Sequence, residues 1–188
     1  MRLKLLFAVF WLSLVTACTL HHGSQRESQP SPESPLVASS YPSLEVQAKE
    51  VKEAFLRKDY ARYADLTYAK SIEASGGKER FVKKLEEDMK EVEARGLKYL
   101  SFTLDTPSQI IRDSGSLYAV VPNHLTVKDA DSTYRTYDCM IGVSSDNGHN
   151  WTFVDVGAFG KNGLSLSLGD VTNKLELPPE KKPVKLSE

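Results

Sequence analysis

Two side chains in the second half of the chain, His124 and Asp138, have the chemistry of a general acid or base. Histidine titrates close to neutral pH, and a carboxylate can take up a proton when it lies within hydrogen-bond reach of a substrate. Cys139 adds a thiol beside Asp138. No His or Asn spacing typical of a cysteine nucleophile accompanies it, which favours a thiol buried in a strand. For His124, an ordinary hydrogen bond within a strand is the simpler interpretation.

The face on which Asp138 lies decides whether it can act as a base. Successive side chains of a strand point to opposite faces of the sheet. If Tyr137 and Cys139 enter a pocket, Asp138 points away from it. If the register is reversed, Asp138 enters the pocket, and the case for an enzyme is stronger. The sequence leaves both registers open.

The stretch SSDNGHNW, residues 144–151, has the spacing Ser-x-Asp-x-Gly-x-x-Trp. It resembles the Asp-box of sialidases and other β-propellers, where the motif is repeated once per blade. Here it occurs once, in a chain too short for a propeller. Asp146 can accept a hydrogen bond from the backbone two residues on, and Asn147-Gly148 tolerates positive φ. We therefore interpret the stretch as a hairpin turn rather than a sugar site.

Metal and phosphate sites find no support in the residue spacing. The chain has no His-x-His, no Glu-x-x-His and no Cys pair with ligand spacing, and we expect no metal or cofactor. The glycine-rich residues 157–163 lack the Lys-Ser/Thr ending of a phosphate-binding loop, so we interpret them as a mobile connection.

The first 17 residues have the pattern of a secretory signal. Arg2 and Lys4 precede an apolar run too short for the ~20 residues that span a bilayer. The run ends in Val15-Thr16-Ala17-Cys18, which resembles the lipobox of bacterial lipoproteins. That resemblance implies cleavage before Cys18 and a lipid anchor on its sulfur and its new amino group.

The predicted location follows from the same resemblance. Thr19 stands where an Asp would resemble an inner-membrane retention signal, so in a host with two membranes we expect the outer membrane, on its periplasmic side. Without residues 1–17 the net charge is about −3, and no basic stripe is present. Because phosphate binding needs a positive surface, nucleic acid is excluded as an expected partner.

The mature chain divides into three parts. Residues 18–43 are rich in Ser and Pro and predict a lipid-anchored, disordered tether. Residues 44–176 have the size of a single domain. Residues 177–188 are rich in Pro and Lys and predict a disordered tail.

Within the domain, helical patterns come first and strand patterns second. Apolar spacing and Gly stops predict three helices, at residues 44–55, 60–67 and 78–95. Turn signals separate five predicted strands, at residues 99–105, 109–112, 117–127, 133–144 and 151–156. Short links between strands favour antiparallel pairing, so the sequence predicts an α+β fold with three N-terminal helices packed on a curved antiparallel sheet.

This order resembles the nuclear transport factor 2-like superfamily, which includes the ketosteroid isomerase and polyketide cyclase families. The resemblance rests on VKEAFLRKDYARYADLT and GGKERFVKKLEEDMK for the helices, and on LYAVVP and SSDNGHNWTFVDVG for the sheet. It implies a cone-shaped pocket between helices and sheet. A cystatin-like helix-on-sheet arrangement has a similar pattern and stays an alternative.

Strand alternation and helix periodicity yield a set of pocket candidates: Tyr63, Tyr118, Tyr137, Cys139 and Trp151. Core packing is the simpler role for each aromatic member of this set. The isomerase-like families imply a carboxylate base and a tyrosine donor; in this chain the alternative would use His124 or Asp138 as base and Tyr63 as donor.

We therefore expect an outer-membrane-anchored, non-enzymatic domain that binds a small apolar ligand, a peptide or an envelope protein. An isomerase-like or cyclase-like enzyme is the first alternative. A structural assembly subunit, pairing sheet to sheet as a homodimer, is the second.

Overall fold

Helices open the fold, as the sequence predicts, but a fourth α-helix and a short 3-10 helix are present in addition to the three expected. The computed structural model describes residues 36–186; Cys18, the signal peptide and the tether up to residue 35 lie outside the described residues. The helical elements before the first strand are η1 (Ala38–Ser40), α1 (Pro42–Leu56), α2 (Tyr60–Leu66), α3 (Ala69–Ala74) and α4 (Lys78–Ala94). The short helix α3 was not predicted.

The starts of these helices have local chemical causes. Pro42 begins α1, because proline has the backbone angle of a first helical residue and needs no N–H there. Asp59 caps α2 by accepting a hydrogen bond from the Arg62 amide at 3.0 Å. Gly77 precedes α4 and has φ of 97°, a backbone angle that residues with a side chain rarely adopt.

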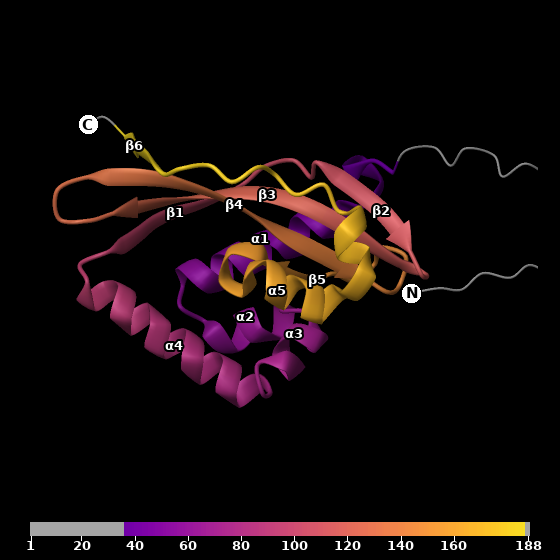
Figure 1. Ribbon diagram of the computed structural model, residues 1–188, viewed down its shortest axis with the longest axis horizontal. Helices are drawn as coiled ribbons and strands as arrows, with labels where there is room; N and C mark the ends of the chain where they lie inside the picture. The colour runs from indigo at the N-terminus through magenta and orange to yellow at the C-terminus, as the bar shows by residue number, and fades with distance from the viewer. Residues whose placement is uncertain (1–35, 187–188) are drawn as a thin grey trace, which may run out of the picture. The chain divides into compact units, whose positions relative to one another are not determined.

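The strands form one antiparallel sheet that is strongly curled (Figure 1). They are β1 (Lys98–Leu104), β2 (Gln109–Asp113), β3 (Ser116–Lys128), β4 (Thr133–Ser144), β5 (Thr152–Asp155) and β6 (Val184–Leu186). The order is β1-β3-β4-β5, with β2 also on β3 and β6 also on β4. The α+β class, with helices followed by a curled antiparallel sheet, is therefore confirmed.

The long hairpin of β3 and β4 is buried on both faces, and alternate residues enter two separate cores. On the inner face, which α1, α2 and α4 cover, Ala119, Val121 and Met140 pack with Leu44 and Phe153. On the outer face, the side chains belong to a second core that α5 (Val156–Leu168) and η2 (Gly169–Lys174) cover; it holds Val120, Cys139, Ile141, Val143, Val154, Leu164 and Leu168.

Residues after β5 differ from expectation. The stretch 157–163, expected to be a mobile connection, lies in α5; Asp155 caps this helix through the Ala158 amide at 2.9 Å. Gly160 has φ of 63° and interrupts the helical backbone. Further on, the stretch expected to be a disordered tail runs back along the sheet, and β6 pairs with residues Thr133 to Arg135 of β4.

The SSDNGHNW stretch is the turn between β4 and β5. Asp146 accepts hydrogen bonds from Ser144 Oγ at 2.8 Å and from the Asn150 amide at 2.9 Å, four residues on rather than two. These bonds, led by the one from the Asn150 amide, lower the pKa of Asp146 to about 2. Trp151 is buried and donates from its ring N–H to the Gly148 carbonyl at 3.1 Å.

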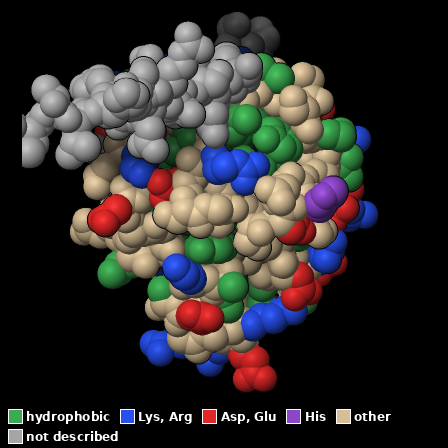
Figure 2. Space-filling view, turned by 90° about the vertical axis from the view of Figure 1, so that its right-hand side faces the viewer, with side chains coloured by type: hydrophobic (Ala, Val, Ile, Leu, Met, Phe, Trp, Pro, Cys, Tyr) green, Lys and Arg blue, Asp and Glu red, His purple; other side chains and the backbone are tan. Residues whose placement is uncertain are grey.

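Charges of both signs lie interspersed on the protein surface shown in Figure 2. Within residues 36–186, no helix has the length and apolar character needed to cross a bilayer.

Gly148 offers a test of how this turn is packed. Its φ is 88°, and a Cβ at this position would collide with the Tyr41 ring. We expect Gly148→Val to lower the free energy of unfolding by about 2–4 kcal/mol, measured by urea denaturation. Gly115→Val is the matched control, because Gly115 has a similar φ of 83° and open space around it. Equal losses for the two variants would contradict the role of the Tyr41 contact.

Candidate functional site

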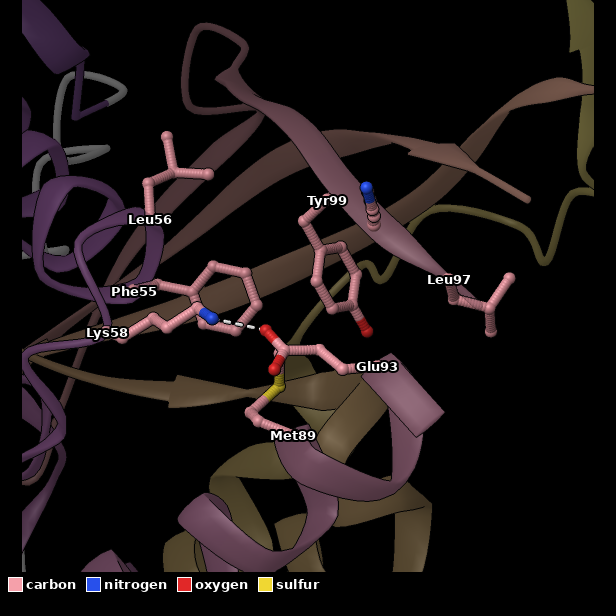
Figure 3. Close-up of a pocket in the computed structure, with 8 residues that line it drawn as sticks. Phe55, Leu56, Lys58, Met89, Glu93, Leu97 and Tyr99 are labelled. Atoms are coloured by element: carbon pink, nitrogen blue, oxygen red, sulfur yellow. Dashed lines mark hydrogen bonds and ion pairs between the residues drawn. The ribbon is translucent and has the colours of Figure 1, made fainter. Parts of the chain in front are cut away.

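A pocket of about 440 Å³ opens between the ends of α1 and α4 and the start of β1 (Figure 3). We call it the aromatic pocket. It is lined by Phe55, Leu56, Lys58, Met89, Glu93, Leu97, Lys98 and Tyr99. The rings of Phe55 and Tyr99 meet edge to face, with centroids 5.2 Å apart. Pockets of this volume with mainly apolar walls are typical of small-ligand sites.

The pocket exists because α4 is only partly packed. Its apolar stripe is formed by Phe81, Val82, Leu85, Met89 and Val92, and none of these side chains is fully buried. Phe81 and Leu85 reach the inner core, whereas Met89 lines the pocket. A helix with such a stripe normally buries it against the core. The C-terminal half of α4 thus leaves apolar surface available to a ligand.

An exposed ion pair lies across the mouth of this pocket. Lys58, just after α1, pairs with Glu93 near the end of α4, as the dashed line in Figure 3 marks. Exposed ion pairs contribute only about 0–1 kcal/mol. This one therefore presents a small barrier to opening the mouth.

Asp138 lies on the inner face, so the register in which it enters the pocket side is the correct one. Its strand neighbours two and four residues on, Met140 and Gly142, both meet the inner core. Burial, followed by the charges of Asp155 and Asp138, raises the pKa of Tyr63, a buried α2 residue on the same side. Tyr137 and Cys139 point to the other face of the sheet, yet all three residues line the second pocket described below.

Asp155 is the residue that the sequence analysis missed. Its carboxyl group is buried, although part of the residue's surface remains exposed. Burial, reinforced by the charge of Asp138, raises its pKa to about 6, while hydrogen bonds from backbone N–H groups and from the Tyr63 hydroxyl partly oppose that rise. The only signal in the sequence is an acid at the end of a strand, two residues before a glycine.

The two carboxylates share the first turn of α5. Asp138 accepts from the Cys139 amide at 2.7 Å, and the nearby Gly157 amide acts to lower the pKa of both carboxyl groups. Burial is the larger influence, and the pKa of Asp138 is raised as well. A side chain on Gly157 would collide with the Asp138 carboxylate, so this contact depends on glycine.

A series of aromatic rings connects the carboxylates with the pocket wall. Tyr63 lies 6.1 Å from Phe55 and stacks on Phe81, centroid to centroid 6.4 Å. Tyr99 belongs to the lining, and the charge of Asp155 contributes to raising its pKa. The acidic group is therefore within electrostatic range of the aromatic pocket.

The pocket residues expected from the sequence are divided between the two faces of the sheet. Tyr63 and Trp151 lie on the inner side, but Trp151 is only 2% exposed and belongs to the core. Tyr118 and Cys139 pack in the outer core. Burial raises the pKa of the Cys139 thiol to about 12, which is opposite to what a nucleophile needs.

A second pocket, of about 580 Å³, lies where the C-terminal segment crosses the outer face. Asn123, Tyr137, Asp138 and Cys139 are among the residues that line it, and Lys181 lies 5.0 Å above the Tyr137 ring. His124 is on this face, 3.7 Å from Asp105 and with its ring 6.2 Å from that of Tyr137. The structure thus separates His124 from Tyr63, with which the enzyme alternative combined it.

Among the described residues, no three His, Cys, Asp or Glu side chains come together as a metal site would require. What the inner face offers instead is a pair of carboxylates, a tyrosine hydroxyl and an apolar pocket. Neither carboxylate lines the aromatic pocket, and Asp138 lines the second pocket instead.

Ionised Asp155 should destabilise the fold, and this can be measured. Its pKa is higher in the folded than in the unfolded chain, so the free energy of unfolding falls as pH rises from about 4 to above 6. Asp155→Asn keeps a capping side chain but does not titrate. Between pH 4 and pH 8, its free energy of unfolding should therefore rise by about 2–3 kcal/mol relative to that of the parent. Urea denaturation at pH 4 and pH 8 measures it; parallel pH profiles for the two proteins would contradict the buried-carboxyl assignment.

Comparison with protein-family models, with curated proteins and with solved structures gives no match to this chain.

Proposed function

We propose that this protein binds a small, mainly apolar ligand in the aromatic pocket and is not an enzyme. The observation that carries the proposal is the half-covered stripe of α4 above a pocket of about 440 Å³. Exposed apolar surface in a concave site costs free energy unless something covers it. A ligand held between Met89 on one side and Phe55 and Tyr99 on the other would cover it.

The ion pair at the mouth supports a site that can open. Lys58 follows the end of α1 and Glu93 belongs to α4, and both side chains are half-exposed. A ligand can enter when the two side chains separate, because water solvates each of them. The cost is small compared with the burial of an apolar ligand, at about 25 cal/mol per Å².

The finer fold assignment is part of the same proposal. A nuclear transport factor 2-like cone is supported by the helices before the curled sheet and by the pocket on its inner face. A cystatin-like arrangement remains the alternative, since it also packs helices on one face of an antiparallel sheet.

An acid–base enzyme of the isomerase or cyclase type is the second candidate. One observation favours it: a tyrosine hydroxyl, that of Tyr63, hydrogen-bonds to a carboxyl group with a pKa near 6. In this version Asp155 replaces His124 as the proton acceptor, since His124 lies on the outer face. A group that titrates near the working pH is suited to proton transfer.

For the cellular location we propose a lipoprotein anchored through Cys18 to the outer membrane, on the periplasmic side. Two features of the sequence support this location: small residues directly precede Cys18, and position 19 is Thr rather than Asp. Two or more acyl chains make such anchoring stable, because a single chain binds membranes only marginally.

Filling the aromatic pocket tests the binding function. We expect Met89→Trp to weaken binding of the neutral fluorescent probe N-phenyl-1-naphthylamine by at least about tenfold, because the larger ring occupies the ligand's space. Lys90→Trp is the matched control, since it adds the same ring to the exposed side of α4. A fluorescence titration measures the probe affinity of both variants. The proposal would be contradicted if the parent does not bind the probe, or if the two variants lose the same amount of affinity.

Processing at Cys18 tests the anchor. In cells, globomycin should cause the unprocessed precursor to accumulate, and Cys18→Ser should abolish both cleavage at this bond and incorporation of radiolabelled palmitate. Gel mobility and labelling measure these effects. Cleavage of the Cys18→Ser protein at the same bond would show that the chain is secreted by another route.

A further inference from the structure

The chain that follows η2 is held firmly at its start. Gln109 of β2 donates from its side-chain amide to the Lys174 carbonyl at 3.3 Å, and its side-chain oxygen accepts from the Glu176 amide at 2.9 Å. Leu175 is buried in the outer core, and Leu177 packs against that core. The chain is therefore fixed as far as Leu177.

Beyond this point the chain is held weakly. We call residues 178–186 the strap; it runs along the sheet and ends in β6 (Figure 1). Residues 179–185 are exposed, and only the three residues of β6 pair with β4. Among the described residues, no backbone hydrogen bond joins residues 178–183 to the sheet. A short, exposed edge strand with few hydrogen bonds opens at a low cost in free energy.

The space beneath the strap is not filled. The second pocket, of about 580 Å³, lies there, and its walls come from the sheet, the N-terminal part of α5 and the C-terminal segment itself. Packed protein interiors have few voids larger than a water molecule. The strap therefore covers this part of the outer face without packing closely onto it.

Between β5 and β6, one edge of β4 is left open. β5 pairs with residues 140–143 of β4, and β6 pairs with residues 133–135. Among the described strands, none pairs with residues 136–139 on this side. Pro183 explains the gap, because a proline ring holds φ at about −65°, whereas an antiparallel strand has φ of about −140°. The pairing of β6 therefore ends at Val184.

Backbone groups of β4 are directed at this open edge. Cys139 lies opposite Pro122, whose carbonyl accepts from the Asp105 amide at 2.9 Å on the side of β1. The two residues therefore form a pair without mutual hydrogen bonds, and the Cys139 N–H is directed at the open edge. The Asp138 carboxylate accepts from it at 2.7 Å, so a side chain stands in for a strand. Tyr137, two residues earlier, presents its own N–H and C=O to the same edge.

The lining of the second pocket is acidic, and its one basic side chain belongs to the strap. Asp105 and Asp138 come from the body of the domain, whereas Glu180 and Lys181 come from the strap. Lys181 Nζ lies 5.0 Å from the centroid of the Tyr137 ring, a cation–π contact. Without the strap, the lining keeps two acids and an aromatic face but no basic side chain. The site therefore favours a positively charged side chain at the position of Lys181.

Two other basic side chains lie near this edge but outside the lining. His124 is 3.7 Å from Asp105, and Arg135 belongs to the stretch with which β6 pairs. The strap is accommodated beside both of them, although it carries three lysines: Lys181, Lys182 and Lys185. A basic strand is thus the charge type that this edge already accepts.

We propose that the open edge of β4 is a docking site for an extended, lysine-bearing segment of a partner protein, which displaces the strap and adds a strand along residues 133–139. In strand addition, main-chain hydrogen bonds supply affinity and side-chain pockets supply specificity. A segment without prolines gains ladder bonds at Tyr137 and at the Cys139 carbonyl, which the strap does not make. Its lysine takes the place of Lys181 over the Tyr137 ring. The site is on the outer face and does not depend on ligand binding in the aromatic pocket.

Synthetic peptides test the docking site on the purified full-length protein. The probe is a fluorescein-labelled peptide with the sequence of residues 177–186, in which Pro178, Pro179 and Pro183 are replaced by threonine, a residue that favours strands. We expect it to bind at least about tenfold more tightly than the peptide of unchanged sequence, because it can form the additional ladder bonds. Replacing the lysine that corresponds to Lys181 by glutamate should weaken binding by about fivefold or more. Fluorescence anisotropy measures the three affinities.

A disulfide that holds the strap in place is the matched control. Tyr134 and Lys185 are direct partners across β4 and β6, so Tyr134→Cys with Lys185→Cys has the Cα separation that a disulfide needs. Oxidation of this double variant should weaken binding of the threonine peptide by at least about tenfold, and dithiothreitol should restore it in the same protein. Cys139 is buried and does not compete for the bridge.

A second pair of variants tests the role of the Tyr137 ring. Tyr137→Leu should remove the difference in affinity between the lysine and glutamate peptides. Tyr118→Leu should keep that difference, because Tyr118 packs against the same outer core but does not line the second pocket.

Several results would overturn the inference. The threonine peptide could fail to bind the parent, or bind no more tightly than the unchanged peptide, and either result would rule out pairing along the open edge. Equal binding by the oxidised and reduced double variant would place the peptide elsewhere on the protein. A dimer of the parent in light scattering that is lost when the strap is locked would overturn the choice of partner, since the occupant would then be the strap of a second copy.

Discussion

The burial of the β3–β4 hairpin on both faces is the constraint from which the rest of the structure follows. The two strands pair over their full length, and their alternate residues supply two cores. Each face needs a cover of its own, which α1 and α2 provide inside and α5 and η2 provide outside. A sheet buried on both faces would expose its apolar side chains to water if either cover were missing.

This constraint also explains why α4 is only partly packed against the core. The helices α1 and α2 already satisfy most of the inner face, and Tyr63 and Leu66 of α2 belong to its core. The helix α4 packs against α2 and reaches the core only through Phe81 and Leu85. Its other apolar residues, Val82, Met89 and Val92, stay partly exposed, and Met89 lines the aromatic pocket.

The strand pattern was predictable because its signals are local. Alternation and turn residues placed β1 to β5 within one or two residues of their bounds. The short helix α3 was not predicted, because six residues carry too little periodicity to distinguish a helix from a turn. The helix α5 was not predicted, because Gly157, Gly160 and Gly163 lower the helix propensity of this stretch. The features that stabilise it are its capping by Asp155 and the burial of Leu164 and Leu168, and the burial depends on tertiary contacts.

The face on which Asp138 lies was not predictable for a related reason. Its strand carries apolar residues at consecutive positions from Cys139 to Val143, because both faces are buried, so alternation alone cannot say which face is inside. Asp155 was equally hidden, since its raised pKa arises from burial and from a neighbour 17 positions earlier in the chain. Such properties exist only once the sheet and α5 bring the two acids together.

The hydrogen bonds already made by Asp155 bear on the choice between binding and catalysis. An ionised carboxylate has about four acceptor positions. For Asp155, the Ala158 amide donates to one of them at 2.9 Å, and the Gly157 amide and the Tyr63 hydroxyl lie close enough to favour the charged form. These donors lower the pKa, but burial outweighs them, so the pKa of Asp155 is raised to about 6 and the carboxylate is a stronger base than a free one. The capping bond from Ala158 holds the carboxylate in place at the start of α5. A fixed carboxylate with a pKa near neutrality is suited to proton transfer, so Asp155 is the residue on which the choice between binding and catalysis depends.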